Sequence, residues 1–181
     1  MASPVESAEL VRDFANTVDI EDGIDELESP AGLTEWLRDH RLLVRGSADR
    51  SALDLARRLR DEIRHALDDH HDGVERAYPR LDRIVSNLPL RLTFPAGDPV
   101  LVPAADGVRG ALGQVVVAMA RAEADGSWQR LKLCREDTCQ WAFLDTSKNR
   151  SRTWCSMGIC GNRSKTRAYR ARQRPDVSAD T

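Results

Sequence analysis

Four cysteines at a regular spacing constrain the fold of this chain more than any other feature. They form two Cys-x4-Cys pairs, and fifteen residues separate the pairs. All four lie in the last third of the 181 residues, at Cys134, Cys139, Cys155 and Cys160. Two close pairs joined by a short loop are typical of a tetrahedral Zn²⁺ site with four thiolate ligands. We therefore expect one structural zinc ion per chain.

Two other roles for these cysteines stay open at this point. Disulfides would allow three pairings, but small disulfide-stapled domains belong to oxidising compartments. The chain start, Met1 to Glu6, lacks the features of a signal peptide, and no apolar run approaches the roughly 18 residues of a membrane span. We therefore expect a cytoplasmic protein without membrane contact. A redox dithiol would normally show Cys-x2-Cys, and neither pair has that spacing.

Charge divides the chain close to where the cysteines begin. The net charge is −2, yet the first 128 residues carry 15 basic and 24 acidic residues. Residues 129–174 carry 12 basic and only three acidic residues. With 41% hydrophobic and 31% charged residues, the composition excludes fibrous, disordered and membrane proteins. A basic module joined to an acidic one suggests contact with a polyanion.

The acidic part is expected to be mainly α-helical. Apolar residues recur at helical spacing in five segments: residues 10–18, 30–37, 51–69, 74–85 and 110–123. In the third segment, which has a start signal at Ser51, four apolar residues fall four apart on one face: Leu55, Leu59, Ile63 and Leu67. Pro79 marks either a kink or the true start of the fourth segment. Residues 90–94 and 100–102 predict a small β-hairpin.

The basic part predicts a treble-clef-like zinc finger, built from a β-hairpin and a helix. Alternating residues favour strands at 141–145 and 150–154, and residues 161–173 favour a helix. The expected domains are a helical domain over 1–126, a finger over 127–174 and a disordered tail over 175–181. A unit as small as this finger depends on metal coordination for its folding free energy. We expect the helical domain, by contrast, to fold without the metal.

The motif Cys160-Gly161-Asn162-Arg163 carries a family resemblance. Residues 133–172, which contain it, resemble the CGNR zinc finger, a bacterial DNA-binding module. Upstream, three short segments look like the ABATE domain that accompanies this finger in stress-induced transcription regulators: residues 13–17, 33–37 and 59–64. The resemblance implies a regulator that binds double-stranded DNA. The helical domain would then bind a small-molecule effector or form a homodimer.

Clustered basic residues are the electrostatic footprint of nucleic-acid binding. Arginine can pair with guanine O6 and N7, so three arginines at helical spacing are candidates for base readout: Arg163, Arg167 and Arg170. The candidates for backbone contact are Lys148, Arg150, Arg152, Lys165 and Arg172. The alternative is that these residues form a solvated basic surface. Asn162 could contact adenine, but closing the turn after Cys160 explains it better.

The acidic part offers four candidate effector ligands in or near its apolar helices: Asn16, Thr17, Arg60 and Arg64. Helix capping and internal hydrogen bonds are the alternative role for such residues. No catalytic motif is present, so we expect a binding protein rather than an enzyme. The main hypothesis is a DNA-binding transcription regulator. The second hypothesis is a zinc-finger adaptor that binds protein or RNA.

Overall fold

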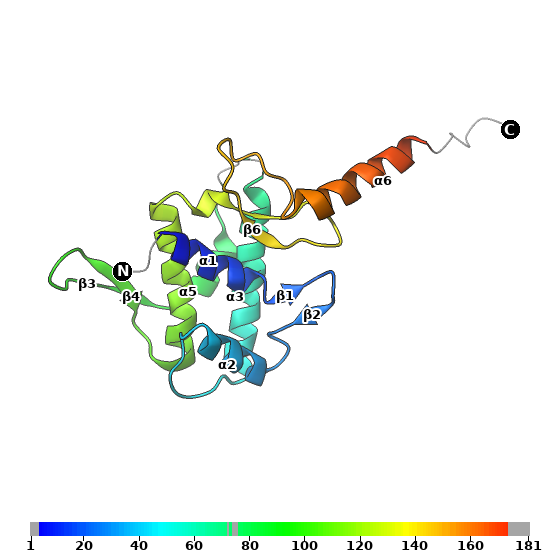
Figure 1. Cartoon of the computed structure of the whole chain (residues 1–181). Coiled ribbons are helices and arrows are strands. Elements are labelled where there is room, and N and C mark those ends of the chain that lie inside the picture. Colours follow the sequence, from blue (N-terminus) through cyan, green and yellow to red (C-terminus); the bar gives the residue numbers. More distant parts are fainter. Residues whose placement is uncertain (1–3, 72, 74–75, 174–181) are drawn as a thin grey trace.

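The computed structural model describes residues 4–71, 73 and 76–173, and the fold is mainly α-helical, as the sequence predicts. The helices are α1 (Pro4–Ala15), α2 (Pro30–Asp39), α3 (Arg50–Asp69), α4 (Pro79–Val85), α5 (Gly107–Ala124) and α6 (Asn162–Arg172). In Figure 1, α1 crosses α3 and α5, while α6 extends away from the other helices. Within the described part of the chain, no helix is long and apolar enough to cross a membrane. The predicted tail, residues 175–181, lies outside the described residues.

Local signals place the helix starts. The Ser29 side chain caps α2, and Pro30 is its first residue, a combination that favours a helix start. Helix α3 begins slightly before the predicted Ser51, because the side chain of Asp49 accepts a hydrogen bond from the first turn. Pro79 begins α4 rather than kinking it. Capping side chains and prolines act over a few residues of sequence, so the predicted start of α3 differs from the observed one by a single residue.

In the part of the chain that the structure describes, each of the three sheets is a two-stranded antiparallel hairpin. The pairs are β1 (Val18–Asp19) with β2 (Ile24–Asp25), β3 (Leu90–Thr93) with β4 (Val100–Pro103), and β5 (Leu131–Leu133) with β6 (Ala142–Leu144). The hairpin predicted around residues 90–102 is confirmed. The strand predicted at 150–154 is wrong, because β6 pairs with β5.

Residues 150–154 do not form a strand because side chains form hydrogen bonds with the backbone groups of this segment. Lys132 Nζ donates to the Arg150 carbonyl, and Asp145 accepts from the backbone N–H of Arg152. The segment therefore forms a fixed loop instead of a strand.

The main core lies between α1, α3 and α5. The four predicted core residues of α3 are all buried: Leu55, Leu59, Ile63 and Leu67. Helix α1 contributes Val11 and Phe14, and α5 contributes Leu112 and Val115. Phe14 also makes an edge-on contact with Trp36 of α2, at 5.2 Å between ring centroids. The apolar face predicted for α3 therefore faces the core.

The same core continues into the basic part of the chain. Leu131 and Leu133 of β5 and Ala142 of β6 belong to one buried apolar cluster with the helices. Helix α3 packs against β5, and α1 packs against β6. A smaller cluster next to it contains three cysteines and the buried Phe143. The predicted boundary between residues 126 and 127 thus lies within one continuous core.

Candidate metal centre and nucleic-acid interface

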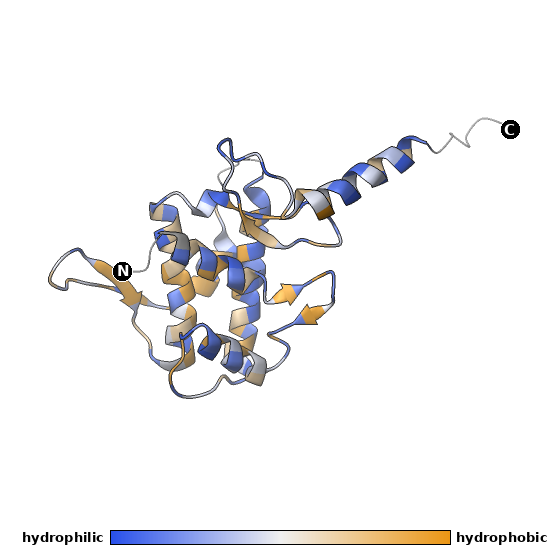
Figure 2. Ribbon diagram, in the orientation of Figure 1, coloured by the Kyte–Doolittle hydropathy of each residue, from blue (hydrophilic) through white to orange (hydrophobic). Residues whose placement is uncertain are grey.

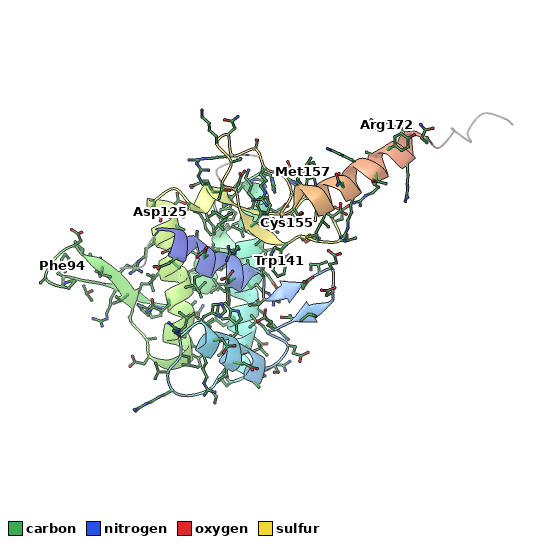
Figure 3. The ribbon with its side chains drawn as sticks, viewed as in Figure 1. Phe94, Asp125, Trp141, Cys155, Met157 and Arg172 are labelled. Atoms are coloured by element: carbon green, nitrogen blue, oxygen red, sulfur yellow. The ribbon has the colours of Figure 1, made fainter. Side chains whose placement is uncertain are left out.

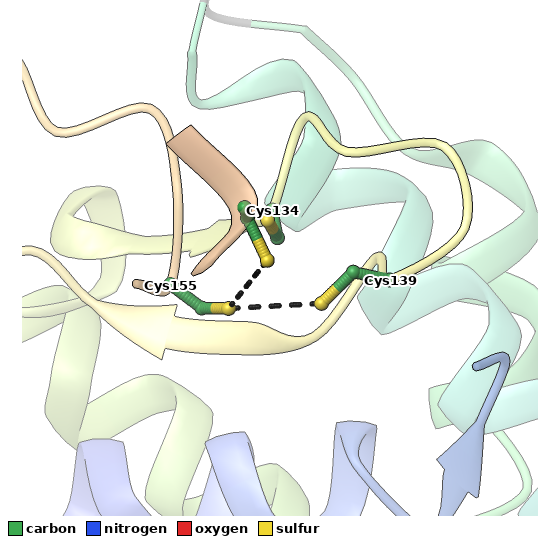
Figure 4. A group of neighbouring side chains, drawn as sticks. Cys134, Cys139 and Cys155 are labelled. Atoms are coloured by element: carbon green, nitrogen blue, oxygen red, sulfur yellow. Dashed lines mark hydrogen bonds between the residues drawn. The ribbon is translucent and has the colours of Figure 1, made fainter. Parts of the chain in front are cut away.

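The four predicted metal ligands come together at one point. Their sulfur atoms all lie within 4.8 Å of one another. The Cys155 sulfur is 3.6 Å from that of Cys139 and 3.7 Å from that of Cys160. Figure 4 shows Cys134 and Cys139, which lie on one turn, converging with Cys155, which comes from another segment of the chain. All four are free thiols, so the structure contains none of the three disulfide pairings.

These separations fit a metal ion with four thiolate ligands. A tetrahedral ion with bonds of about 2.3 Å to sulfur holds neighbouring sulfurs about 3.8 Å apart. Burial raises the pKa of Cys155, with further contributions from the Cys139 and Cys160 thiols. Burial also raises the pKa of Cys160, to about 11. Four thiolates in this space therefore need a bound cation, which would also drive their deprotonation.

The cysteine ligands are supplied by two turns. Cys134 directly follows β5, and Cys139 lies shortly before β6, so this hairpin carries the first pair. Cys155 precedes a short π-helical turn, Met157–Gly161, which contains Cys160 and leads into α6. Asn162 donates from Nδ2 to the Gly158 carbonyl at 2.9 Å, and so closes this turn. The second metal-binding turn therefore joins the metal site rigidly to the first residues of α6.

Two predicted effector ligands bind the backbone of the first turn and its hairpin instead of lining an open site. Asn16 donates from Nδ2 to the Ala142 carbonyl at 3.0 Å and accepts from the Ala142 N–H at 2.7 Å. Arg64 donates to the Ala15 carbonyl at 2.9 Å and to the Gln140 carbonyl at 3.0 Å. Gln140 directly follows a ligand cysteine and has a φ of 50°, in the left-handed region. Helices α1 and α3 thus hold the first metal-binding turn.

Of the other two predicted effector ligands, Arg60 holds the β1–β2 hairpin and Thr17 binds the end of α1. Arg60 forms two hydrogen bonds to the Asp25 carboxylate, at 2.6 and 3.1 Å. Burial raises the pKa of Asp25, but Arg60, together with the Leu27 N–H and the charge of Arg57, lowers it below its ordinary value overall. Thr17 donates to the Phe14 carbonyl at 2.9 Å. All four predicted effector ligands therefore have partners within the chain, and effector binding stays a prediction.

Two histidines contribute contacts that the sequence did not reveal. His70 Nδ1 lies 2.7 Å from the Leu131 carbonyl, and His71 Nε2 lies close to the Leu133 carbonyl. Burial lowers the pKa of both histidines. These contacts with β5 depend on packing between segments about 60 residues apart.

A buried ion pair fixes the basic loop after β6. Lys132 Nζ lies 3.0 Å from Asp145 Oδ2, and both side chains are almost fully buried. Burial raises the pKa of Asp145, but hydrogen bonds from Ser147, Lys132 and Arg152 lower it to about 2 overall. A sequence signal for this pair was present, since Lys132 interrupts the apolar strand between Leu131 and Leu133. The loop that follows carries Lys148 and Arg150.

Three of the eight predicted nucleic-acid ligands have partners within the chain. Arg163 pairs with Glu21 at 2.7 Å, and Arg167 pairs with the buried Glu136. Arg152 donates to the Trp154 and Cys155 carbonyls, and its guanidinium lies 4.9 Å from the centroid of the Phe143 ring. It therefore ties the second metal-binding turn to the buried ring of β6.

The other five predicted ligands have no ion pair with a described residue: Lys148, Arg150, Lys165, Arg170 and Arg172. Three of them lie on α6, which buries none of its side chains. Figure 2 shows α6 as predominantly hydrophilic, and Figure 3 shows Arg172 at the end farthest from the metal site. The chain thus presents an exposed basic helix directly after its metal centre.

Comparison with protein families gives two matches. The ABATE family model, described as "Putative stress-induced transcription regulator", matches residues 8–125. The CGNR zinc finger model matches residues 130–173. No curated protein matches the chain. The two matches cover the helical part and the metal site respectively.

Proposed function

Because this chain belongs to the ABATE family and ends in a CGNR zinc finger, we propose that it regulates transcription by binding double-stranded DNA. Both families were expected from the sequence, and both are confirmed. The binding surface is α6 together with the loop that carries Lys148 and Arg150. The metal centre acts as a structural element that sets the position of α6. The proposal is one of binding rather than catalysis.

The observation that carries this proposal is the exposure of α6. An isolated helix of this length is marginally stable in water, and α6 gains no stability from burial. Its charges point to what would stabilise it, because three of its basic residues have no acidic partner among the described residues. Duplex DNA offers a row of phosphates that would bind those cations. The major groove also has the width to accept a helix.

We also propose that the metal is zinc. Four thiolates in a closed tetrahedral set are typical of structural zinc sites, since every coordination position is taken by the protein. Zn²⁺ with four thiolates carries a net charge of −2, which nearby cations such as Arg64 and Arg152 would offset. Elemental analysis of the purified protein should find one zinc ion per chain. Less than half an equivalent of zinc in protein prepared under reducing conditions would refute this.

The salt dependence of binding to a fluorescent duplex tests the DNA proposal. If the five unpaired basic residues each release one counterion from the DNA on binding, log K should fall with log[salt] at a slope of about −4 to −5. Lys148→Met should reduce the magnitude of the slope by about one unit. Arg58→Met is the matched control, because Arg58 is exposed on α3, away from this surface.

The same assay separates DNA from the adaptor hypothesis. A regulator should retain binding when a single-stranded RNA of equal charge competes, and should prefer some duplex sequences over others. A slope near zero, or tighter binding to the RNA than to every duplex tested, would refute the proposal.

A further inference from the structure

The helix α6 has two faces with different surroundings. One face, here called the groove face, borders a groove of about 840 Å³ beside the first metal-binding turn. It consists of Asn162, Arg163, Thr166, Arg167, Arg170 and Ala171. The opposite half of the helix, here called the outer face, consists of Ser164, Lys165, Ala168, Tyr169 and Arg172. The two sets divide the helix cleanly, so their contacts can be compared.

Acidic residues hold the groove face at two points. Arg163 pairs with Glu21 at the β1–β2 turn, at 2.7 Å. One turn further, Arg167 pairs with Glu136 and lies 3.7 Å from Asp137. Glu136 and Asp137 belong to the turn between the first two cysteines. The direction in which α6 leaves the metal centre is therefore tied to both the finger and the helical domain.

The pair between Arg167 and Glu136 would be costly to open. Glu136 is 2% exposed, and its Oε2 has no hydrogen-bond partner among the described residues. Thr138 donates to Oε1 at 3.3 Å, so Arg167 supplies the positive charge that compensates this carboxylate. If Arg167 turned to DNA, it would leave a buried charge unpaired, which is strongly unfavourable. Arg167 is thus poorly suited to base contact.

The outer face has the opposite character. Neither Lys165 nor Arg172 forms an ion pair with a described residue, and Tyr169 is 58% exposed. Among the described residues, the acids that pair with α6 are Glu21, Glu136 and Asp137, and they lie on the side of the groove face. They would repel phosphates from the first two turns of that face, so phosphates would be attracted to the outer face and to the unpaired Arg170 in the last turn. Charge complementarity therefore favours the approach of a duplex from the side opposite the groove.

We propose that the outer face of α6 reads the bases of DNA and that Arg163 and Arg167 are positioning residues. This inference rests on the proposed function and changes roles expected from the sequence: Lys165 and Arg172 move from backbone contact to base readout, and Arg163 and Arg167 move from base readout to positioning. Lys165 and Arg172 are suited to guanine, and the methyl group of Ala168 is suited to the methyl group of thymine. From Lys165 to Arg172 the helix rises about 10 Å, which corresponds to roughly three base pairs.

The first experiment identifies the reading face. A preferred duplex is selected from a random library with the full-length, zinc-loaded protein, and its affinity is compared with that of an unrelated duplex. Lys165→Ala and Arg172→Ala should each weaken binding to the preferred duplex by about 5- to 150-fold. They should weaken binding to the unrelated duplex much less. Selection repeated with each variant should lose the preference at a subset of positions.

The second experiment tests the positioning role. Arg167→Ala and Glu136→Gln should each weaken binding to both duplexes by a similar factor, roughly 3- to 10-fold, because an ordered helix becomes mobile. The double variant should be no weaker than either single one, since both remove the same pair. Arg167→Lys should restore part of the affinity. Asp22→Asn, an equal loss of charge on the exposed β1–β2 turn, should instead strengthen binding slightly.

The outcomes distinguish this inference from the proposed function. If the wild-type protein shows no salt-dependent DNA binding, the proposed function itself fails. If it binds DNA, but Arg167→Ala abolishes base preference while Lys165→Ala and Arg172→Ala retain it, only the assignment of faces is overturned. The assignment is also overturned if Glu136→Gln strengthens binding as Asp22→Asn does. If Glu136→Gln loses zinc, the test of the positioning role uses Arg167→Ala instead, because Arg167 lies outside the turn that carries the first two cysteines.

Discussion

Replacing Arg64 by methionine should weaken both the fold and the metal site. Arg64 is 8% exposed and donates from its two terminal nitrogens to the Ala15 and Gln140 carbonyls. Methionine would fill much of the same space but donate nothing. Both carbonyls would then be left without this partner, one at the end of α1 and the other in the first metal-binding turn.

The size of the effect follows from these two bonds. A hydrogen bond from a charged donor contributes about 1.5 to 3 kcal/mol, so two contribute about 3 to 6 kcal/mol. Removing the guanidinium also removes the cost of burying its charge, the same cost that lowers the pKa of Arg64. We expect a net loss of about 2 to 4 kcal/mol in the free energy of unfolding. The midpoint of urea unfolding should fall by about 1 to 2 M.

The metal should report the same change. Gln140 follows the ligand Cys139, so loosening its backbone should disturb the coordination geometry. Loss of an outer contact of this kind typically costs 10- to 100-fold in metal affinity. Competition with a chromophoric chelator measures it, and Arg58→Met on the exposed side of α3 is the control. Equal unfolding midpoints and equal metal affinities for the two variants would show that Arg64 does not hold this turn.

Three further predictions follow from other contacts. The pKa of Asp145 is lowered to about 2, so this carboxylate should contribute roughly 2 kcal/mol to the free energy of unfolding above pH 4. This stability is lost as the pH falls through 2. Asp145→Asn should remove this acid dependence in urea titrations. Gly32→Ala should destabilise the protein although alanine favours helices, because its Cβ would lie 2.2 Å from the Glu26 carbonyl oxygen, and a raised thermal midpoint would contradict this. Removing the metal with a chelator, or replacing Cys155 in Cys155→Ser, should also lower the thermal midpoint of the helical part, because β5 and β6 share its core. An unchanged helical transition by circular dichroism would show that the two parts fold independently.

Much of the local structure could be predicted from the sequence. The apolar spacing in α3, the cap at Ser29 and the proline that begins α4 all act over a few residues. The four cysteines were recognisable because thiolate ligands recur at short, regular intervals around a tetrahedral ion. The partner of β6 was not predictable in the same way, because β5 and residues 150–154 both have alternating patterns and both lie near β6 in the sequence. The buried ion pair between Lys132 and Asp145 favours pairing with β5.

By itself, the sequence determined the cysteine site, the basic character of α6 and the helical nature of the first part. These properties depend on residue types and on spacings along the chain. Only the tertiary structure decided which arginines of α6 are held by acids and that Asn16 binds Ala142, 126 positions away. Hydrogen bonds and ion pairs act between side chains that folding brings together, and spacing along the chain carries no record of those partners. The metal ligands could therefore be predicted from the sequence, whereas the contacts between the helical core and the metal centre could be identified only in the folded chain.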